Sequence, residues 1–294
     1  MKTSSSQQSA VASFLSMIRP ANSVMVGFAV IVGIAAASND YREIFTVVSL
    51  LGFLTGFLIS SFSMVSNDIY DLEVDRVNQP SRPLPSGAVS VKNAWSISIC
   101  LLVGGLLAST ALGVVNFIIA AVFALVGWFY NYRGKKMGLA GNSMVALSLA
   151  IPYIYGSVAL GNYAVNLGYL LALTSFLAGL GREVLKGISD VEGDRIRNIR
   201  TVAIARGVRS ARLATAILFI AAVGSSSLPV AFSLLGRALP VYLALVAIPD
   251  AIFIYLAYKV LALKKEQDSL RLKSVALAGM MFGLVTYLVS GLLV

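Results

Sequence analysis

The stretch Asn67–Arg76, with the sequence NDIYDLEVDR, directly follows an apolar run that is long enough to cross a bilayer. Asn67, Asp71 and Asp75 are spaced four residues apart, and Asp68 lies three residues before the second of them. Helical periodicity places these four oxygen-bearing side chains along one face, a turn apart. Mg²⁺ prefers oxygen ligands and binds one or two carboxylates together with substrate phosphates. The spacing therefore predicts a magnesium site at the end of a membrane-spanning helix; the alternative is a solvated helix end.

A second acidic motif, DVEGD at Asp190–Asp194, repeats this pattern later in the chain. Its two aspartates have the same spacing as Asp71 and Asp75. Each motif ends an apolar run and is followed by arginines and a glycine, which are Arg76, Arg82 and Gly87 after the first motif and Arg195, Arg200 and Gly207 after the second. Such self-similarity predicts an internal duplication with a function at its corresponding points. Two acidic clusters near arginines describe a site for a diphosphate carried on Mg²⁺.

The composition is typical of an all-α membrane protein. Hydrophobic residues make up 58% of the 294 residues, charged residues make up 12%, and the mean hydropathy is +0.85. Soluble domains do not have this composition, whereas polytopic membrane proteins do. We predict a single domain over residues 1–294 that contains two four-helix repeats and a ninth helix. The nine spans are expected at 20–38, 44–66, 91–111, 114–132, 142–160, 165–185, 208–226, 238–262 and 273–293.

The net charge of +10 follows a membrane topology rather than a nucleic-acid-binding surface. When the connections between spans are assigned to alternate sides, all but two of the 23 Lys and Arg residues fall on one side; the exceptions are Arg42 and Arg237. This asymmetry is a strong positive-inside signal. It predicts a multi-pass protein of the cell membrane, with the N-terminus and both acidic motifs cytoplasmic and the C-terminus outside. Nucleic acid is therefore not an expected partner.

Two arginines are candidates for binding phosphate. Arg19 precedes Pro20 at the start of the first span, where it either meets a phosphate or serves as an ordinary cytoplasmic anchor. Arg82 lies in a segment with three prolines between positions 80 and 85, which predicts an extended, stiff loop that is not helical. Such a loop either holds the arginine over the site and excludes water, or is simply a rigid connector.

Aromatic and polar side chains gather at the end of the fourth span. Trp128 and Tyr132 are typical of the aromatic belt at a membrane interface. Tyr130 and Asn131 are better candidates for the site, because they come just before a cationic segment at 133–136 on the side of the membrane that carries the acidic motifs. We therefore include both residues among the candidates for substrate contact.

Two further charged residues have competing interpretations. Lys186 precedes Asp190 by four residues, so it forms either an intrahelical ion pair or a mobile charge at the diphosphate. Asp250 follows Pro249 within an apolar run, where a carboxylate costs about 2.5–3.5 kcal/mol on insertion scales and normally has a partner or a role. We favour a structural role for this carboxylate at the proline over a catalytic one.

These features predict chemistry on a substrate with a diphosphate head and a long hydrocarbon tail. Mg²⁺ neutralises the charge of the leaving group, and nearby Arg and Lys side chains stabilise the departing diphosphate. Ionisation leaves an allylic carbocation, which aromatic faces stabilise and which an acceptor nucleophile captures where bulk water is excluded. The chain has no histidine, which excludes a histidine base, but an aspartate can deprotonate the acceptor.

These motifs resemble those of the UbiA superfamily of intramembrane prenyltransferases. The resemblance extends from Arg19-Pro20-x-Asn22 to the ninth span and includes the first acidic motif, the RPLPSG segment at 82–87, Tyr130-Asn131 with Lys135, and the second acidic motif. It implies nine transmembrane helices around a central cavity, in which two Mg²⁺ ions hold a prenyl diphosphate. It also implies that the acidic motifs bind metal and diphosphate, and that Tyr130 lies near the reacting carbon.

The candidate residues fall into three groups. Those expected to act in catalysis are Asp71, Asp75, Asp190, Asp194, Tyr130 and Lys186. Those expected to bind substrate are Arg19, Asn22, Asn67, Arg82, Asn131, Lys135 and Arg200. Those expected to bind metal are Asn67, Asp68, Asp71, Asp75, Asp190 and Asp194.

Within the family, the RPLPSG segment and the run Arg182-Glu183-x-x-Lys186 are most similar to the archaeal branch that makes digeranylgeranylglyceryl phosphate. This resemblance implies transfer of a geranylgeranyl group to a hydroxyl of geranylgeranylglyceryl phosphate, with membrane lipid around the protein. That branch usually has an acid after the lysine, where this chain has Gly187. The alternatives are an aromatic acceptor, as in prenyl transfer of the quinone or chlorophyll type, and a membrane transporter. Acids at the cytoplasmic rim and repeats in parallel order favour the enzyme over the transporter.

Overall fold

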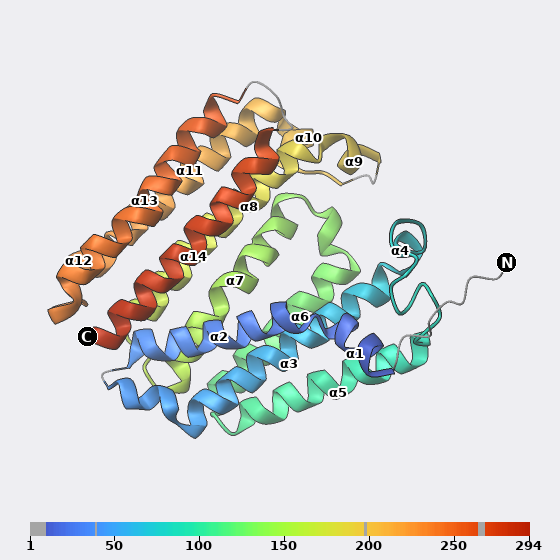
Figure 1. Cartoon of the computed structure of the whole chain (residues 1–294), viewed down its shortest axis with the longest axis horizontal. Coiled ribbons are helices and arrows are strands. Elements are labelled where there is room, and N and C mark those ends of the chain that lie inside the picture. Colours follow the sequence, from blue (N-terminus) through green and yellow to red (C-terminus); the bar gives the residue numbers. More distant parts are fainter. Residues whose placement is uncertain (1–9, 39, 197–198, 264–267) are drawn as a thin grey trace. The chain divides into compact units, whose positions relative to one another are not determined.

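The computed structural model describes residues 10–38, 40–196, 199–263 and 268–294, and all regular structure in these ranges is helical (Figure 1). This confirms the all-α prediction. The elements in chain order are α1 (Ala10–Ile18), α2 (Pro20–Ala37), η1 (Tyr41–Phe45), α3 (Val47–Tyr70), α4 (Leu72–Asn78), α5 (Val91–Thr110), α6 (Val114–Tyr132), η2 (Gly134–Lys136), α7 (Leu139–Ala159), α8 (Leu167–Ser189), α9 (Val191–Ile196), α10 (Val202–Arg206), α11 (Val208–Ser226), α12 (Leu228–Ala231), η3 (Gly236–Ala238), α13 (Leu239–Leu261) and α14 (Ser269–Leu293).

Eight helices of the described chain are long and apolar enough to cross a membrane, and they correspond to eight of the nine predicted spans. They cover Pro20–Ala37, Val47–Tyr70, Val91–Thr110, Val114–Tyr132, Leu139–Ala159, Val208–Ala231, Gly236–Leu261 and Ser269–Leu293. The remaining predicted span, 165–185, forms the 23-residue helix α8, which does not qualify. Much of α8 is buried and its last turns carry charged residues, so it does not need an apolar face toward lipid. Nine spans around a central cavity therefore stay a prediction.

The chain divides into two compact units. The first contains the residues up to Phe28 and Leu51–Tyr132, and the second contains Ala29–Leu50 and Arg133–Val294. In the first unit, α3 packs on α5 through a core that includes Ile59, Phe62 and Leu101. Only 22% of each of the spans α5 and α6 is buried, and many of their exposed residues are apolar. This is expected of helices that face lipid.

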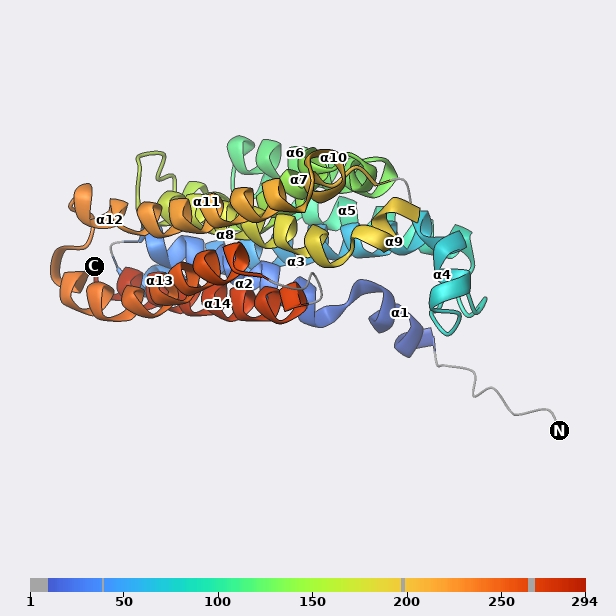
Figure 2. The ribbon, with the colours of Figure 1, turned by 90° about the horizontal axis from the view of Figure 1, so that it is seen from above.

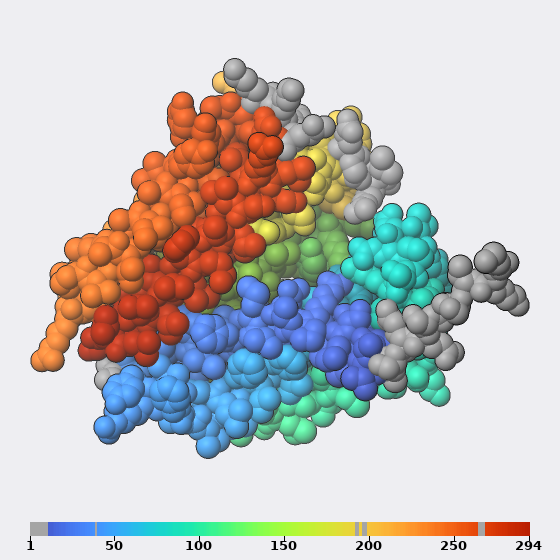
Figure 3. Space-filling view, in the orientation of Figure 1, coloured from blue at the N-terminus to red at the C-terminus, as the bar shows by residue number. Residues whose placement is uncertain are grey.

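In the second unit, α8 packs against α7, α11 and α14, and α13 packs against α11 and α14 (Figures 1 and 2). The outer helices α13 (orange) and α14 (red) lie side by side at the surface (Figure 3). The core between these helices includes Leu185, Ile188, Phe219 and Leu256, all of them fully buried. The last two turns of α8 are thus held from several sides, which fixes the helix end that precedes the second acidic motif.

The proline-containing segment after the first motif differs from its prediction. It is not helical, as expected, but it folds into consecutive turns instead of running extended. The Ser86 amide donates to the Arg82 carbonyl oxygen at 3.0 Å, and the Gly87 amide donates to the Leu84 carbonyl oxygen at 3.1 Å. Leu84 is only 6% exposed and packs into the core of the first unit. Burial of this leucine favours a compact segment over the extended one that prolines alone suggest.

Candidate active site

The two acidic motifs occupy the same local structure. Asp71 is the single residue between α3 and α4, with φ −92° and ψ 3°, and Asp190 is the single residue between α8 and α9, with φ −104° and ψ 9°. In each motif the amide of the second aspartate, Asp75 or Asp194, donates to the carbonyl oxygen of the first at 2.8 Å. The sequence repeat is therefore also a repeat of backbone structure: a long helix, one aspartate outside it, and a short helix.

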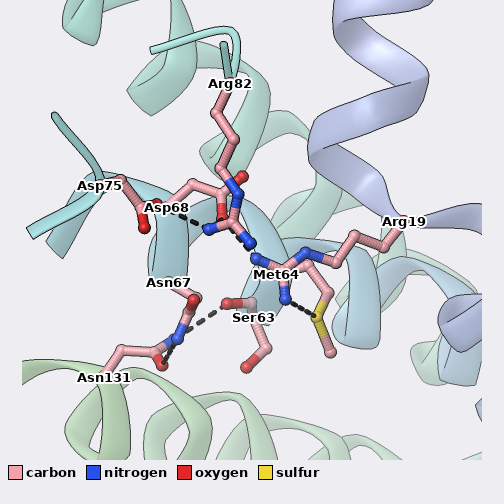
Figure 4. Close-up of polar contacts among 8 residues, drawn as sticks. All are labelled: Arg19, Ser63, Met64, Asn67, Asp68, Asp75, Arg82 and Asn131. Carbon is pink, nitrogen blue, oxygen red and sulfur yellow. Dashed lines mark hydrogen bonds and ion pairs between the residues drawn. The ribbon is translucent and has the colours of Figure 1, made fainter. Parts of the chain in front are cut away.

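The first motif contains two buried carboxylates, which are bound by arginines from elsewhere in the first unit (Figure 4). Arg19 Nη2 lies 2.5 Å from Asp68 Oδ1, and Arg82 Nη1 lies 2.6 Å from Asp75 Oδ2. The same Arg82 nitrogen is 3.6 Å from Asp68 Oδ1, so one guanidinium links both carboxylates. Asp68 is 4% exposed and Asp75 is 6% exposed. Charge-assisted hydrogen bonds of this kind are the stronger class, and a buried carboxylate requires such compensation.

Arg19 reaches the motif from the junction between α1 and α2. Its φ of 46° lies in the left-handed region, an uncommon conformation for a residue with a Cβ atom, which costs of order 1–3 kcal/mol. The carbonyl oxygen of Arg19 accepts hydrogen bonds from the amides of Asn22 and Ser23, and Pro20 begins α2 directly after it. Arg19 Nη1 also donates to Met64 Sδ at 3.6 Å. The strained junction thus directs the Arg19 side chain onto α3.

Asn67 is directed to a different partner from its neighbour Asp68 (Figure 4). Its Nδ2 donates to Asn131 Oδ1 at 3.0 Å, and Asn131 Nδ2 donates to the Ser63 carbonyl oxygen at 2.9 Å. The structure therefore joins two predicted substrate-binding residues in one pair. This pair connects α3 to α6 at the level of the first motif.

An aromatic cluster supports the end of α3, and its central residue, Tyr70, is not among the predicted site residues. Tyr70 OH accepts a hydrogen bond from Trp128 Nε1 at 2.9 Å, and its ring meets Trp95 edge-on with centroids 6.0 Å apart. Trp128 stacks on Tyr132 at 5.6 Å. The sequence assigned Trp128 and Tyr132 to the membrane belt, but both contact the residue just before Asp71. No sequence spacing links these helices, so the cluster had no signal of its own.

The remaining candidates of the first unit and the connecting region lie in different environments. Tyr130 is half-buried on α6, beside Asn131 in the sequence. Lys135 is half-buried in η2, whereas Asn22 and Arg200 are exposed. Tyr130 and Lys135 are therefore partly enclosed by the protein, whereas Asn22 and Arg200 are open to solvent or lipid.

The second motif is preceded by a charged group on α8. Arg182 Nη1 donates to Glu183 Oε1 at 3.1 Å, and Lys186 Nζ lies 3.9 Å from Glu183 Oε2. Lys186 thus pairs with Glu183 rather than forming the ion pair with Asp190 that its spacing allowed. Asp190 Oδ1 instead accepts from Ser189 Oγ at 3.1 Å. Arg182 Nε is buried and has no hydrogen-bond partner among the described residues, which costs about 1–3 kcal/mol.

The donor set of the motifs fits Mg²⁺. No group of three or more His, Cys, Asp and Glu side chains in the described part of the chain is arranged to hold a metal ion. Mg²⁺ does not require such a group, because it takes one or two carboxylates and completes its shell with water and substrate phosphates. Asp68 and Asp75 offer buried carboxylate oxygens, and the sequence contains no histidine that would favour a softer metal.

Asp250, the carboxylate inside an apolar run, has a partner in the second unit. Both of its oxygens accept from Ser226 Oγ, at 3.0 and 2.9 Å, and Tyr242 OH donates to the Ser226 carbonyl oxygen at 2.5 Å. These contacts connect Asp250, which follows Pro249 on α13, to Ser226 at the end of α11. They agree with the structural role that the sequence favoured for this residue.

Residues 26–286 match the family model of the UbiA prenyltransferase family. The chain belongs to this family. It is therefore a multi-pass membrane enzyme that transfers prenyl groups, which decides against the transporter alternative. The match covers most of the chain, including both acidic motifs, and confirms the resemblance on which the sequence-based assignment was made.

Named relatives and solved structures agree with this membership. The digeranylgeranylglyceryl phosphate synthase of Archaeoglobus fulgidus is 32% identical over 92% of this chain and 92% of its own length. A solved structure of a digeranylgeranylglyceryl phosphate synthase is 30% identical and has a TM-score of 0.85. The two structures align over 97% of this chain and 99% of the other. A UbiA homologue from Archaeoglobus fulgidus, bound to DMAPP and Mg²⁺, shares the fold at 18% identity and a TM-score of 0.63, over 93% of this chain and 98% of that one.

Proposed function

We propose that this enzyme transfers a geranylgeranyl group from its diphosphate to geranylgeranylglyceryl phosphate, in ether-lipid synthesis of the archaeal type. The observation that carries the proposal is the pair of acidic motifs at equivalent helix breaks, at Asp71 and Asp190. It is supported by relatives named digeranylgeranylglyceryl phosphate synthase, which align over more than nine-tenths of the chain. We place the acidic motifs on the cytoplasmic side of the cell membrane, because the positive charges collect there.

The acidic motifs are the proposed sites of two Mg²⁺ ions, since a related protein of this fold binds DMAPP and Mg²⁺. When bound, Mg²⁺ supplies positive charge to the diphosphate leaving group and lowers the barrier to its departure. The proposed ligands are Asn67, Asp68, Asp71, Asp75, Asp190 and Asp194. Among them, Asp68 and Asp75 already lie on a common cation, the guanidinium of Arg82, so their oxygens converge on one position.

The basic and polar residues hold the diphosphate and stabilise the charge that it gains on leaving. Arg19 and Arg82 are suited to this role because their side chains are partly exposed, 29% and 27%, while their carboxylate partners are buried. Lys186, 49% exposed at the end of α8, supplies a mobile charge near the second motif. Asn22, Asn67, Asn131, Lys135 and Arg200 complete the proposed set of diphosphate and substrate contacts.

The transfer breaks the bond between the first carbon of the prenyl chain and the diphosphate oxygen, and forms an ether bond to the acceptor hydroxyl. The π face of Tyr130 stabilises the allylic cation that separates the two events. A carboxylate of the acidic motifs takes the proton of the hydroxyl, because the chain has no histidine to do so. Lipid-facing helices around the site keep bulk water from capturing the cation.

The decisive experiment offers two acceptors separately to the purified protein in lipid nanodiscs with Mg²⁺ and radiolabelled geranylgeranyl diphosphate. We expect an ether product with geranylgeranylglyceryl phosphate and none with 4-hydroxybenzoate. Product from 4-hydroxybenzoate alone would overturn the acceptor and leave the prenyl transfer. Asp71→Asn and Asp190→Asn are each expected to remove turnover, and the exposed Glu73→Gln is the matched control that keeps it. Turnover near that of the wild type in either aspartate variant would contradict the proposed site.

A further inference from the structure

The charged group on α8 contains a guanidinium, that of Arg182, whose Nε atom no described residue binds. Arg182 has three nitrogens, and Glu183 accepts a hydrogen bond from Nη1 alone. The Nε atom is buried and has no hydrogen-bond partner within the described residues. Nε and Nη2 form the side edge of the planar fork, and this edge matches two oxygens of a phosphate or carboxylate. A buried donor of this kind is normally satisfied, so the edge indicates a ligand.

The surroundings of this edge favour an anion. Glu183 is only 10% exposed and lies between two cations, at 3.1 Å from Arg182 and 3.9 Å from Lys186. One carboxylate compensates one of the two positive charges, so the three side chains together retain a positive charge. Lys186 Nζ is 49% exposed and can swing toward a bound anion, while the buried carboxylate keeps the guanidinium in place. Glu183 thus acts as a positioning residue for Arg182.

The position of this group along α8 separates it from the second acidic motif. With a rise of about 1.5 Å per residue, Lys186 lies roughly 6 Å and Arg182 roughly 12 Å before Asp190 along the helix axis, toward the middle of α8. At about 100° per residue, Arg182, Lys186 and Asp190 also lie on one side of the helix. An anion held by Arg182 therefore lies deeper than the diphosphate that the acidic motif would hold, and on the same side.

We infer that the Nε–Nη2 edge of Arg182 binds the phosphate monoester of the acceptor lipid, with Lys186 placed between this phosphate and the diphosphate of the donor. This inference rests on the proposed function. The prenyl chain extends from the diphosphate toward the middle of the membrane, so its first carbon lies deeper than the diphosphate. The attacking hydroxyl must meet that carbon, and the acceptor phosphate is bonded to the carbon next to the one that bears the hydroxyl. A phosphate site slightly deeper than the acidic motif satisfies both conditions.

The test compares two acceptors that differ only in the phosphate, geranylgeranylglyceryl phosphate and geranylgeranylglycerol. Full-length protein in nanodiscs is assayed with Mg²⁺ and geranylgeranyl diphosphate, and KM and kcat are measured for donor and acceptor separately. Arg182→Lys keeps the charge but lacks the planar fork. We expect it to raise KM for the phosphorylated acceptor by about 10- to 100-fold, the loss that follows from removing hydrogen bonds to a charged group. KM for the donor stays within about twofold.

Glu183→Gln gives a second and milder variant, in which Arg182 remains but is less firmly held. We expect a higher KM for the phosphorylated acceptor with kcat little changed. Arg209→Lys, at an exposed arginine of α11 in the same unit, is the control and leaves both KM values unchanged. A binding measurement in EDTA without donor gives an independent readout, in which wild-type protein binds the phosphorylated acceptor more tightly than geranylgeranylglycerol and Arg182→Lys binds the two alike.

The outcomes distinguish this inference from the proposed function. If the wild type makes no product with the phosphorylated acceptor, the proposed function fails. If the wild type makes product but both variants retain its preference for the phosphorylated acceptor, the proposed function stands and the Arg182 site is refuted. A rise in the donor KM alone would show that Arg182 binds the diphosphate of the donor, which also overturns the inference.

Discussion

The ion pair between Arg82 and Asp75 should stabilise the first unit far more than a neighbouring surface pair does. Arg82→Leu leaves Asp75, which is 6% exposed, without the guanidinium 2.6 Å away, while Asp68 keeps Arg19. Removing one partner of a buried pair costs about 3–5 kcal/mol. Because Arg82 is 27% exposed, we expect about 3 kcal/mol, the lower end of that range. Adding Asp75→Asn should recover about 2 kcal/mol of this loss, since it removes the uncompensated charge.

The chain supplies its own control. Glu73 and Arg76 form a pair at 2.8 Å on α4, but they are 79% and 56% exposed. An exposed helical pair contributes about 0.5 kcal/mol or less. The same double-mutant cycle on this pair should therefore give a coupling energy several times smaller than the cycle on Arg82 and Asp75.

The measurement is reversible unfolding in mixed micelles, followed by tryptophan fluorescence. Both tryptophans of the chain, Trp95 and Trp128, lie in the first unit and both contact Tyr70. The signal thus reports on the unit that contains the ion pair. If the coupling energy of Arg82 and Asp75 is no larger than that of the exposed control pair, the inference that burial gives this contact its strength is refuted.

Three further substitutions test other contacts of the structure. Trp128→Phe removes the hydrogen bond to Tyr70 OH and should lower the free energy of unfolding by about 1 kcal/mol, measured by thermal unfolding in detergent, whereas an unchanged stability would contradict the role of this contact. Asn131→Leu removes the hydrogen bonds of Asn131 to the Ser63 carbonyl oxygen and to Asn67 Nδ2, and should cost about 1–3 kcal/mol in the same assay; a stabilised variant would show the pair to be dispensable. Gly156→Leu should prevent folding, seen as loss of a monodisperse peak in size-exclusion chromatography, because a Cβ atom there meets the backbone of Val30; a normal peak would refute the close approach of α7 to α2.

The sequence predicted most helices because apolar runs of this length have few other solutions in a membrane protein. The predicted spans 114–132 and 208–226 coincide with α6 (Val114–Tyr132) and α11 (Val208–Ser226), and the other spans differ from their helices by a few residues at one or both ends. The first helix, α1 (Ala10–Ile18), was missed because it is only nine residues long and ends at the strained Arg19. The end of α1 depends on the backbone conformation of Arg19, and the pattern of apolar residues in the sequence gives no information about that conformation.

In the candidate site too, features set by neighbouring residues could be predicted from the sequence, whereas contacts between distant residues could not. The positions of Asp71 and Asp190 follow from a four-residue spacing that is visible in the sequence. The contact of Arg19 with Asp68 joins residues 49 positions apart, and it depends on how α1 and α2 meet the end of α3. The sequence could propose each residue as a candidate, but it could not show that the two form a pair. Contacts across such separations are set by packing, which a single sequence does not specify.

The duplicated motifs share their backbone structure but differ in the source of their positive charge. Around the first motif, Arg82 lies seven residues from Asp75 and Arg19 lies on another helix junction, so the cations come from outside α3. Before the second motif, Arg182 and Lys186 lie on α8 itself and share one carboxylate. Equivalent backbones with different cations suit the proposed function, in which the donor carries a diphosphate and the acceptor carries a phosphate monoester. Both motifs can then hold the leaving diphosphate through Mg²⁺, while the cations before the second motif select the acceptor.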